Sequence, residues 1–349
     1  MKYLCFHLMP YRSLDLSESD KYASLWIRFP NTYYDPAGGH ALYQDFLEEL
    51  EFADRCGFDG VAVNEHHQNA YGMMPQPGVI AGALARTTKV RIAVLGRALP
   101  LLANPLSVAE EYAMIDQISG GRLIFGVGRS AFPRAYNAYG ISYEESQDRF
   151  AESLDIIKTA WTQPIASYRG RYHSFDNFTL VPRPLQQPHP EIRIAASRHE
   201  TYATIGELGY PLFSAVRASP LTELAYHTRA YREAWAAAGH RHEPRAFLQV
   251  PIYVAESREA ALEDAREGMM RFSTYRADLI GGPLSYERVL REKVIAGTPE
   301  MVVERLRELR EAAQLDGVSA EINPGSLLSH EQVMKSLRLY CQEVMPQFK

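Results

Sequence analysis

Gly57-Phe-Asp-Gly-Val-Ala-Val-Asn64 is the stretch that decides the fold, because a helix pattern ends in it and an apolar run follows. Before it, Phe46, Leu50 and Ala53 recur at i, i+4 and i+7, the spacing of one helix face. Gly57 is a typical residue for the end of such a helix. The apolar run at 59–64 predicts a strand, so helix, glycine and strand follow one another here.

The same alternation continues in both directions along the chain. Ser142 and Glu145 have the Ser-x-x-Glu form of a capping box. A later helix begins at Thr298-Pro299-Glu300. Further strands are predicted at 3–9, 90–98, 122–127, 192–196, 212–216, 247–254 and 318–322. Eight strands, mostly continuous in hydrophobicity, predict a parallel sheet covered by helices. A single (β/α)₈ TIM barrel over residues 1–349 is the simplest closed arrangement.

Three segments interrupt the alternation, near residues 10–40, 164–190 and 265–297. The second predicts a small hairpin insertion. The first and third follow the C-terminal ends of strands, where barrels carry their active sites. Loops of this length are usually functional or mobile, so the third is a candidate lid. The first offers apolar walls for a binding site through four aromatic residues: Trp26, Phe29, Tyr33 and Tyr34.

Composition excludes several classes of protein. The chain has 349 residues, 46% of them hydrophobic, and a net charge of −5, which argues against nucleic acid as a partner. No apolar run approaches the roughly 20 residues that span a bilayer, and the N-terminus resembles a strand more than a signal peptide. Three scattered cysteines lack the spacing of a metal site. We therefore expect a cytoplasmic protein that does not enter the membrane.

The most unusual cluster is Asn64-Glu65-His66-His67-Gln68, at the end of the second strand. In an extended segment neighbouring side chains point to opposite faces, so His66 and His67 cannot both face inward. A packed, hydrogen-bonded histidine pair is one interpretation. A metal pair made of Glu65 and His67 is another, but no ligand cluster at other strand ends completes a shell. We predict no metal.

Two further segments are suited to phosphate. Gly126-Val-Gly-Arg129-Ser130 is a strand end with glycines and an arginine, whose planar fork fits phosphate. A structural turn with a surface arginine explains it equally well. Residues 196–201, Ala-Ser-Arg-His-Glu-Thr, precede a helix. They predict either an anion site at a helix N-terminus or an ordinary serine or threonine cap.

Taken together, Glu65-His66-His67, Asn104-Pro105, Ser119–Arg129 and Gly297-Thr-Pro-Glu300 resemble the bacterial luciferase-like flavin monooxygenases. The similarity runs along the whole chain and is most specific over residues 57–130. It implies a (β/α)₈ barrel that binds FMN, or the deazaflavin F420, at its C-terminal mouth. By the same resemblance His66 is the catalytic histidine, with His67 beside it.

The resemblance also implies how the cofactor is held. Arg129 matches the arginine that binds the flavin phosphate, and the bond Leu95–Gly96 falls where the family has a cis peptide against the flavin ring. Ser197 lies in the phosphate-binding stretch, although Arg198 and His199 replace small hydroxylated residues there. The implied cofactor-binding set is Glu65, Leu95, Gly96, Gly128, Arg129, Ser197, Arg198 and His199.

The activity that the resemblance implies is a monooxygenase reaction. Reduced FMN and O₂ would form a C4a-peroxyflavin that oxygenates a small apolar organic substrate. No second nucleotide-binding fingerprint is present, so a separate NAD(P)H:flavin reductase would supply the flavin, and a homodimer is expected. Alternatives are an F420-dependent hydride transfer and a metal-dependent hydrolase using Glu65 and His67. A non-catalytic flavin-binding protein is disfavoured because such relatives have truncated barrels.

Overall fold

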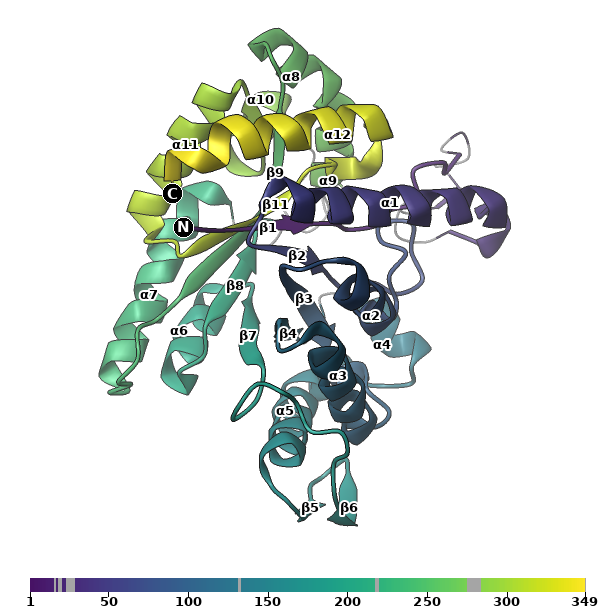
Figure 1. The fold of residues 1–349 in the computed structure, drawn as a ribbon, viewed down its shortest axis with the longest axis vertical. Coiled ribbons are helices and arrows are strands. Elements are labelled where there is room, and N and C mark those ends of the chain that lie inside the picture. The colour runs from purple at the N-terminus through teal and green to yellow at the C-terminus, as the bar shows by residue number, and fades with distance from the viewer. Residues whose placement is uncertain are drawn as a thin grey trace.

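A closed parallel barrel forms the centre of the protein (Figure 1). The computed structural model describes residues 1–15, 17, 21–22, 29–130, 133–216, 220–274 and 284–348. Neighbouring strands follow the order β9-β11-β1-β2-β3-β4-β7-β8, and pairing of β8 with β9 closes the ring. The strands are β1 (Lys2–Phe6), β2 (Gly60–Val63), β3 (Arg91–Ala98), β4 (Leu123–Gly128), β7 (Glu191–Ala196), β8 (Leu212–Ala215), β9 (Ala246–Val254) and β11 (Gly317–Glu321). The predicted eight-stranded parallel barrel is confirmed.

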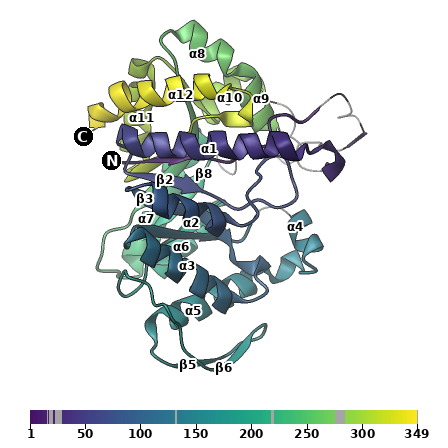
Figure 2. The ribbon, with the colours of Figure 1, turned by 45° about the vertical axis from the view of Figure 1, so that its right-hand side comes forward.

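Helices surround this barrel (Figures 1 and 2). Because helices cover the outside and side chains fill the inside, β2, β4, β9 and β11 are buried along their whole length. The helix before β2 begins after Asp35, whose carboxylate accepts from two backbone N–H groups, and ends at Gly57 with φ 89°. The covering helices are α1 (Pro36–Cys56), α2 (Pro77–Thr87), α3 (Pro105–Ser119), α5 (Ser146–Thr162), α6 (His199–Leu208), α7 (Leu224–Ala237), α11 (Pro299–Ala313) and α12 (His330–Leu339).

Two local predictions were wrong. The first strand ends at Phe6 rather than at Met9, because the chain turns at Met9 (φ 52°) toward the mouth. The capping box of Ser142 and Glu145 does not form. Ser142 instead accepts from the N–H of Glu144 and begins a 3₁₀ turn, and α5 starts only at Ser146. Glu145 pairs with Arg149 at 2.8 Å, an i, i+4 contact that competes with capping.

The interruptions of the barrel have structure of their own. The predicted hairpin is present as β5 (Ala166–Arg169) and β6 (Ser174–Phe178), which pair antiparallel. A short strand that the sequence did not reveal, β10 (Ile295–Gly297), pairs with β9 beyond the end of β8. In the first interruption, Phe29, Tyr33 and Tyr34 are partly buried against the core, whereas Trp26 lies outside the described residues.

The third interruption is largely helical over its described residues, 265–274 and 284–297; the rest of the candidate lid, 275–283, lies outside the described residues. It contains α9 (Arg266–Thr274) and α10 (Tyr286–Glu292), and α8 (Arg258–Asp264) precedes it. The helix α9 packs on the turn Pro324–Ser326 that follows β11. Gly325 has φ 71°, and a Cβ there would overlap the carbonyl oxygen of Gly268. Backbone therefore meets backbone where α9 crosses the C-terminal end of β11, so α9 covers one side of the barrel mouth.

A buried carboxylate joins β1, α1 and α12 beside the mouth. Glu49 accepts from His7 Nε2 at 2.7 Å and from His330 Nδ1 at 2.9 Å. The N–H of Met9 donates to His7 Nδ1, so the ring hydrogen of His7 lies on Nε2. Burial raises the pKa of Glu49, but hydrogen bonds from His330 and His7 outweigh it and leave the pKa below its ordinary value. The hydrogen bond to Glu49 raises the pKa of His330.

Glu49→Gln should lower the free energy of unfolding by about 1–3 kcal/mol. The rings of His7 and His330 donate to different oxygens of Glu49, and glutamine replaces one of these acceptors with an NH₂ group that can only donate, so one ring donor loses its partner. The raised pKa of His330 adds a pH dependence. The contribution of His330 to the free energy of unfolding is fully present below the pKa that His330 has in the unfolded chain. It is lost as pH rises through the higher pKa of His330 in the folded protein. Urea unfolding of wild type and His330→Gln should therefore differ at weakly acidic pH and converge at alkaline pH. A constant difference would contradict this assignment.

Candidate active site

Several residues with an unusual backbone conformation lie at the barrel mouth. Outside glycine, left-handed residues are uncommon because Cβ crowds the backbone. Four of them follow strand ends at this face: Met9, Gln68, Ser130 and Ser326, with φ 52°, 57°, 61° and 63°. They come after β1, β2, β4 and β11. Residues held in sparsely populated regions cluster at functional sites, so the C-terminal mouth is where a site is expected.

The segment after β2 separates its histidines as the alternation predicts. Asn64 and His66 form one pair, in which Asn64 Nδ2 lies 2.8 Å from His66 Nε2. The amide nitrogen can only donate, so His66 Nε2 accepts and Nδ1 carries the hydrogen of the neutral ring. The edge of Tyr71 packs against His66, with ring centroids 4.9 Å apart. His66 is thus held in one orientation and one tautomer.

Glu65 and His67 form the second pair. Glu65 Oε1 accepts from His67 Nε2 at 2.6 Å, and Oε2 accepts from Arg97 Nη1 at 2.5 Å and from the N–H of Ala98 at 2.9 Å. Burial raises the pKa of Glu65, but the charge of Arg97 and the hydrogen bond from His67 outweigh it and hold the pKa below its ordinary value. The two histidines therefore have different partners, and the Glu65 carboxylate is ionised.

The backbones of β3 and β4 approach each other closely toward the C-terminal end of β3. The bond Leu95–Gly96 is cis, as the resemblance implies, and the β3–β4 register shifts between Val94 and Arg97. A Cβ at Gly126, on the facing strand, would overlap the carbonyl oxygen of Val94. Glycine is therefore required there for the two backbones to approach. We call residues 95–98 together with Gly126 the shelf.

Arg129 follows β4 directly and is half-buried. Its Nη1 lies 3.5 Å from Ser146 Oγ at the start of α5, and its carbonyl oxygen accepts from the Tyr136 hydroxyl. The preceding Gly128 lies against β7, since a Cβ there would be 3.1 Å from that of Ala195. The guanidinium thus has no carboxylate partner among the described residues and can bind an anion.

The predicted phosphate loop precedes α6. Arg198 occupies the N-cap position, and no side chain, including that of Ser197, caps the helix. The serine or threonine cap considered from the sequence is therefore absent. His199 Nδ1 lies 3.1 Å from His227 Nδ1, and its ring stacks on Tyr226. The first N–H groups of α6 are left for an anion, as at other phosphate-binding helix starts.

These features fit a flavin mononucleotide. The resemblance places the flavin ring against the cis peptide of the shelf. Two buried polar atoms at the mouth, Asn64 Oδ1 and Ser326 Oγ, lack a hydrogen-bond partner among the described residues. Such atoms are suited to the polar edge of the ring. Arg129 and the uncapped start of α6 are suited to the phosphate. Contact of these residues with the flavin stays a prediction.

Sequence reasoning missed three residues of the site. Arg97 stands in an apolar strand, which is the signal that could have revealed it. Tyr139, in the segment after β4, places its hydroxyl 3.2 Å from His67 Nδ1. Glu321, the last residue of β11, is buried and accepts from Gln249 Nε2 at 2.9 Å. A carboxylate that ends a buried strand gives the same kind of signal as Arg97.

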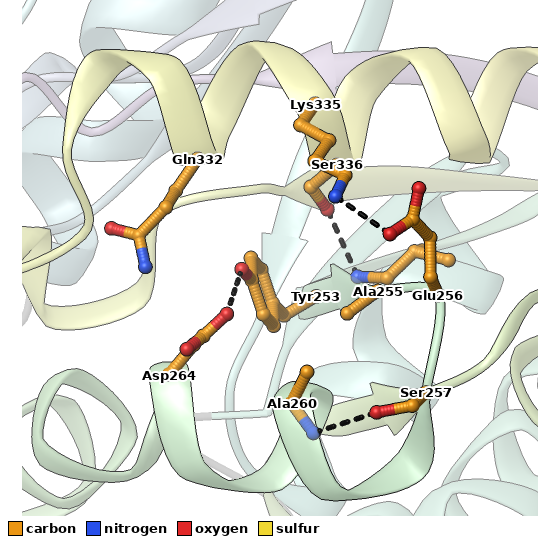
Figure 3. A pocket seen from close by; sticks show the side chains of 10 residues that line it. Tyr253, Ala255, Glu256, Ser257, Ala260, Asp264, Gln332, Lys335 and Ser336 are labelled. Carbon is orange, nitrogen blue, oxygen red and sulfur yellow. Dashed lines mark hydrogen bonds and ion pairs between the residues drawn. The ribbon is translucent and has the colours of Figure 1, made fainter.

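A separate pocket lies outside the barrel, between α8, α12 and the end of β9 (Figure 3). Its polar groups bond to one another: Lys335 pairs with Glu256 at 2.8 Å, and the Tyr253 hydroxyl donates to Asp264 at 2.9 Å. The N–H of Val254 donates to Ser336 Oγ. None of the predicted site residues lines this pocket, which lies where α8 and α12 pack against the end of β9.

Two further searches of the described ranges gave negative results. No three His, Cys, Asp or Glu side chains are placed to hold a metal ion. The pairing of Glu65 with Arg97 also places a fixed cation on the carboxylate that a metal-dependent hydrolase would need. Over the same ranges, none of the helices has the length and apolar character needed to cross a membrane.

Comparison with known proteins connects this geometry to a family. A family model described as luciferase-like monooxygenase matches residues 25–315. The oxygenase component of flavin-dependent trigonelline monooxygenase from Acinetobacter baylyi is 29% identical over 334 residues, 88% of this chain and 90% of that protein. An uncharacterized protein, y4wF from Sinorhizobium fredii, is 36% identical over 160 residues, 46% of each chain. The monooxygenase RslO1 from Streptomyces bottropensis superposes with a TM-score of 0.82 at 26% identity, covering 100% of both chains.

Proposed function

Because the chain belongs to the luciferase-like monooxygenase family, we propose that it is an oxygenase that uses reduced FMN and O₂ to oxygenate a small apolar organic substrate. The observation that carries the proposal is the arrangement at one barrel mouth of a fixed histidine, the shelf and an arginine that has no carboxylate partner among the described residues. A relative that is an oxygenase component of a flavin-dependent monooxygenase supports it.

Reduced FMN, once bound, supplies the electrons and the activation of O₂. The residues of this chain position it and control protons and water. The shelf receives the ring, Arg129 and the start of α6 hold the phosphate, and α9 keeps water from one side of the mouth. Asn64 fixes His66 with Nε2 as acceptor, so Nδ1 carries the hydrogen of the neutral ring, and this is the proton that His66 would transfer. Histidine suits this role because its ordinary pKa, about 6.5, lies near neutrality.

We further propose that a separate NAD(P)H:flavin reductase supplies reduced FMN to this chain in the cytoplasm. The name of the Acinetobacter relative, an oxygenase component, supports a two-component system. The three thiols of the chain are free, two of them buried, which favours a reducing compartment.

The proposal is tested by anaerobic titration of the purified protein with FMN and, separately, with F420. Chemically reduced FMN, ¹⁸O₂ and a panel of apolar organic compounds then follow. We expect FMN to bind and one ¹⁸O atom to appear in a product. Binding of F420 but not of FMN would favour the alternative of hydride transfer. Absence of flavin binding of either kind would contradict the proposed function.

Arg129→Ala should weaken FMN binding by about 10- to 100-fold, the factor that corresponds to the 1.5–3 kcal/mol of a hydrogen bond to a charged group. Quenching of FMN fluorescence on titration measures the affinity. Arg258→Ala removes an exposed arginine from α8 and is the matched control. Riboflavin, which lacks the phosphate, should bind wild type and Arg129→Ala equally. A riboflavin affinity that falls as far as that of FMN would contradict the phosphate assignment.

We propose a homodimer formed through the outer face of α2 and α3. Val79 on α2 and Met114 and Ile118 on α3 are exposed large apolar residues. Clusters of exposed apolar residues usually mark an interaction site. Met114→Glu combined with Ile118→Glu should convert a dimer into a monomer, measured as molar mass by light scattering. Leu208→Glu, on the exposed face of α6, is the matched control and should leave the mass unchanged.

A further inference from the structure

Four side chains form a hydrogen-bonded chain that runs from the surface to the shelf. The Tyr139 hydroxyl lies 3.2 Å from His67 Nδ1, His67 Nε2 lies 2.6 Å from Glu65 Oε1, and Glu65 Oε2 lies 2.5 Å from Arg97 Nη1. A carboxylate can only accept, so His67 Nε2 carries the ring hydrogen. In the neutral ring His67 Nδ1 then accepts, and Tyr139 donates to it. The donor and the acceptor of each hydrogen bond in this series are therefore fixed.

Only one end of this chain is open to solvent. The side chains of Glu65, His67 and Arg97 are 1%, 5% and 7% exposed, whereas Tyr139 is 45% exposed. Inside a protein, hydrogen bonds of this kind are strong and act together, and loss of one partner leaves the others unpaired. The buried end is fixed, because Glu65 also accepts from the N–H of Ala98.

The chain connects three elements of the mouth. Glu65 and His67 follow β2, and Arg97 and Ala98 come directly after the cis bond in the shelf. Tyr139 belongs to the segment after β4, which begins with Arg129 and includes α4 (Pro133–Ala138). Figure 2 shows α4 at the edge of the molecule. One carboxylate thus ties the shelf, through His67, to the segment that carries the proposed phosphate arginine.

From this geometry we propose that Glu65 and His67 are positioning residues for the flavin site, and that Tyr139 is a third. This role differs from the one that the resemblance implies for Glu65 and His67, because they act on the flavin through the shelf and through the segment after β4. The inference rests on the proposed function, since it assigns roles toward FMN. Among the described residues, the hydroxyl of Tyr139 connects to the shelf through His67 and Glu65.

The test is a double-mutant cycle on FMN affinity. Tyr139→Phe should weaken FMN binding about two- to tenfold, and Glu65→Gln about tenfold or more, the factors expected for losing one or two buried hydrogen bonds. The double variant should bind FMN as weakly as Glu65→Gln alone, because Tyr139 acts only through Glu65. Tyr143→Phe removes a hydroxyl from the same segment and should leave the affinity unchanged.

Each other outcome of the cycle overturns the proposal. Multiplying effects of Tyr139→Phe and Glu65→Gln would mean that the two residues contact the flavin independently. An unchanged affinity in Tyr139→Phe would make Tyr139 an ordinary surface residue. If Glu65→Gln does not fold, His67→Gln interrupts the same hydrogen-bonded chain while leaving the Glu65–Arg97 pair in place. It should weaken FMN binding at least as far as Tyr139→Phe does, and addition of Tyr139→Phe to it should have no further effect.

A spectroscopic readout is independent of the flavin. In ¹⁵N-histidine-labelled protein without FMN, His67 should show a protonated Nε2 and an accepting Nδ1. Tyr139→Phe should shift the Nδ1 signal and leave Nε2 in place. A protonated Nδ1 in the wild type would overturn the inference. Failure of the wild type to bind FMN would contradict the proposed function instead, and this ¹⁵N measurement would still decide the direction of the chain.

Discussion

Replacement of His66 by alanine or glutamine should lower product formation by about 10²- to 10⁴-fold, the usual contribution of general acid–base catalysis. The structure makes the glutamine variant the sharper test. Asn64 Nδ2 donates to His66 Nε2, and a glutamine oxygen can accept that hydrogen bond. His66→Gln should therefore keep the local structure and FMN affinity while removing the group that carries the proton.

Three measurements distinguish loss of proton transfer in His66→Gln from loss of FMN binding. FMN titration should give an affinity near that of wild type, while ¹⁸O incorporation falls and reduced FMN is still oxidised, with hydrogen peroxide as the product. His40→Ala, which removes an exposed histidine from α1, should leave all three unchanged. If His66→Gln forms product at the wild-type rate, His66 has no part in the chemistry.

Gly126→Val should abolish measurable FMN binding and lower the free energy of unfolding by about 3 kcal/mol, the upper part of the usual range for overpacking. A Cβ at this position would overlap the carbonyl oxygen of Val94 and lie 2.8 Å from Leu95 Cδ2 and 3.2 Å from Phe213 Cε1. Valine favours strands, so the loss would come from the clash under the shelf rather than from strand propensity.

The control places the same valine side chain in a strand away from the barrel, at a position that already carries a Cβ. Ala166→Val in β5 should change neither the FMN affinity nor the midpoint of urea unfolding by a large amount, since Ala166 is only partly buried. Equal effects of the two variants would show that the packing at Gly126 has no special role. A folded Gly126→Val that binds FMN normally would mean that the flavin does not use the shelf.

Much of the barrel was predictable because its strands are short, apolar and separated by amphipathic helices. Runs such as 59–64 and 122–127 correspond to β2 (Gly60–Val63) and β4 (Leu123–Gly128). The strand β10 was not predictable, because three residues carry no periodicity and its pairing depends on β9 extending beyond β8. The capping box failed because Ser142 found a nearer donor, the N–H of Glu144.

The candidate site was predictable only in part. Strand alternation separated His66 from His67, and the structure confirms that they have different partners. Their tautomers could not be read from the sequence, because they depend on Asn64 and Glu65 through side-chain geometry. Arg97 and Tyr139 lie 32 and 74 residues from Glu65 in sequence, and only the closed barrel brings them together. Flavin contacts themselves stay a prediction.

The contact between α9 and the turn after β11 has a consequence for engineering of substrate range. Gly325 (φ 71°) lies directly against the backbone of Gly268, so Gly325 cannot accept a larger side chain without displacing α9. Laboratory evolution should therefore find few tolerated changes at this corner of the entrance. Substitutions that admit bulkier compounds should accumulate on the opposite rim, in residues 133–141. Sequencing of variants selected for a new substrate would show which rim had changed.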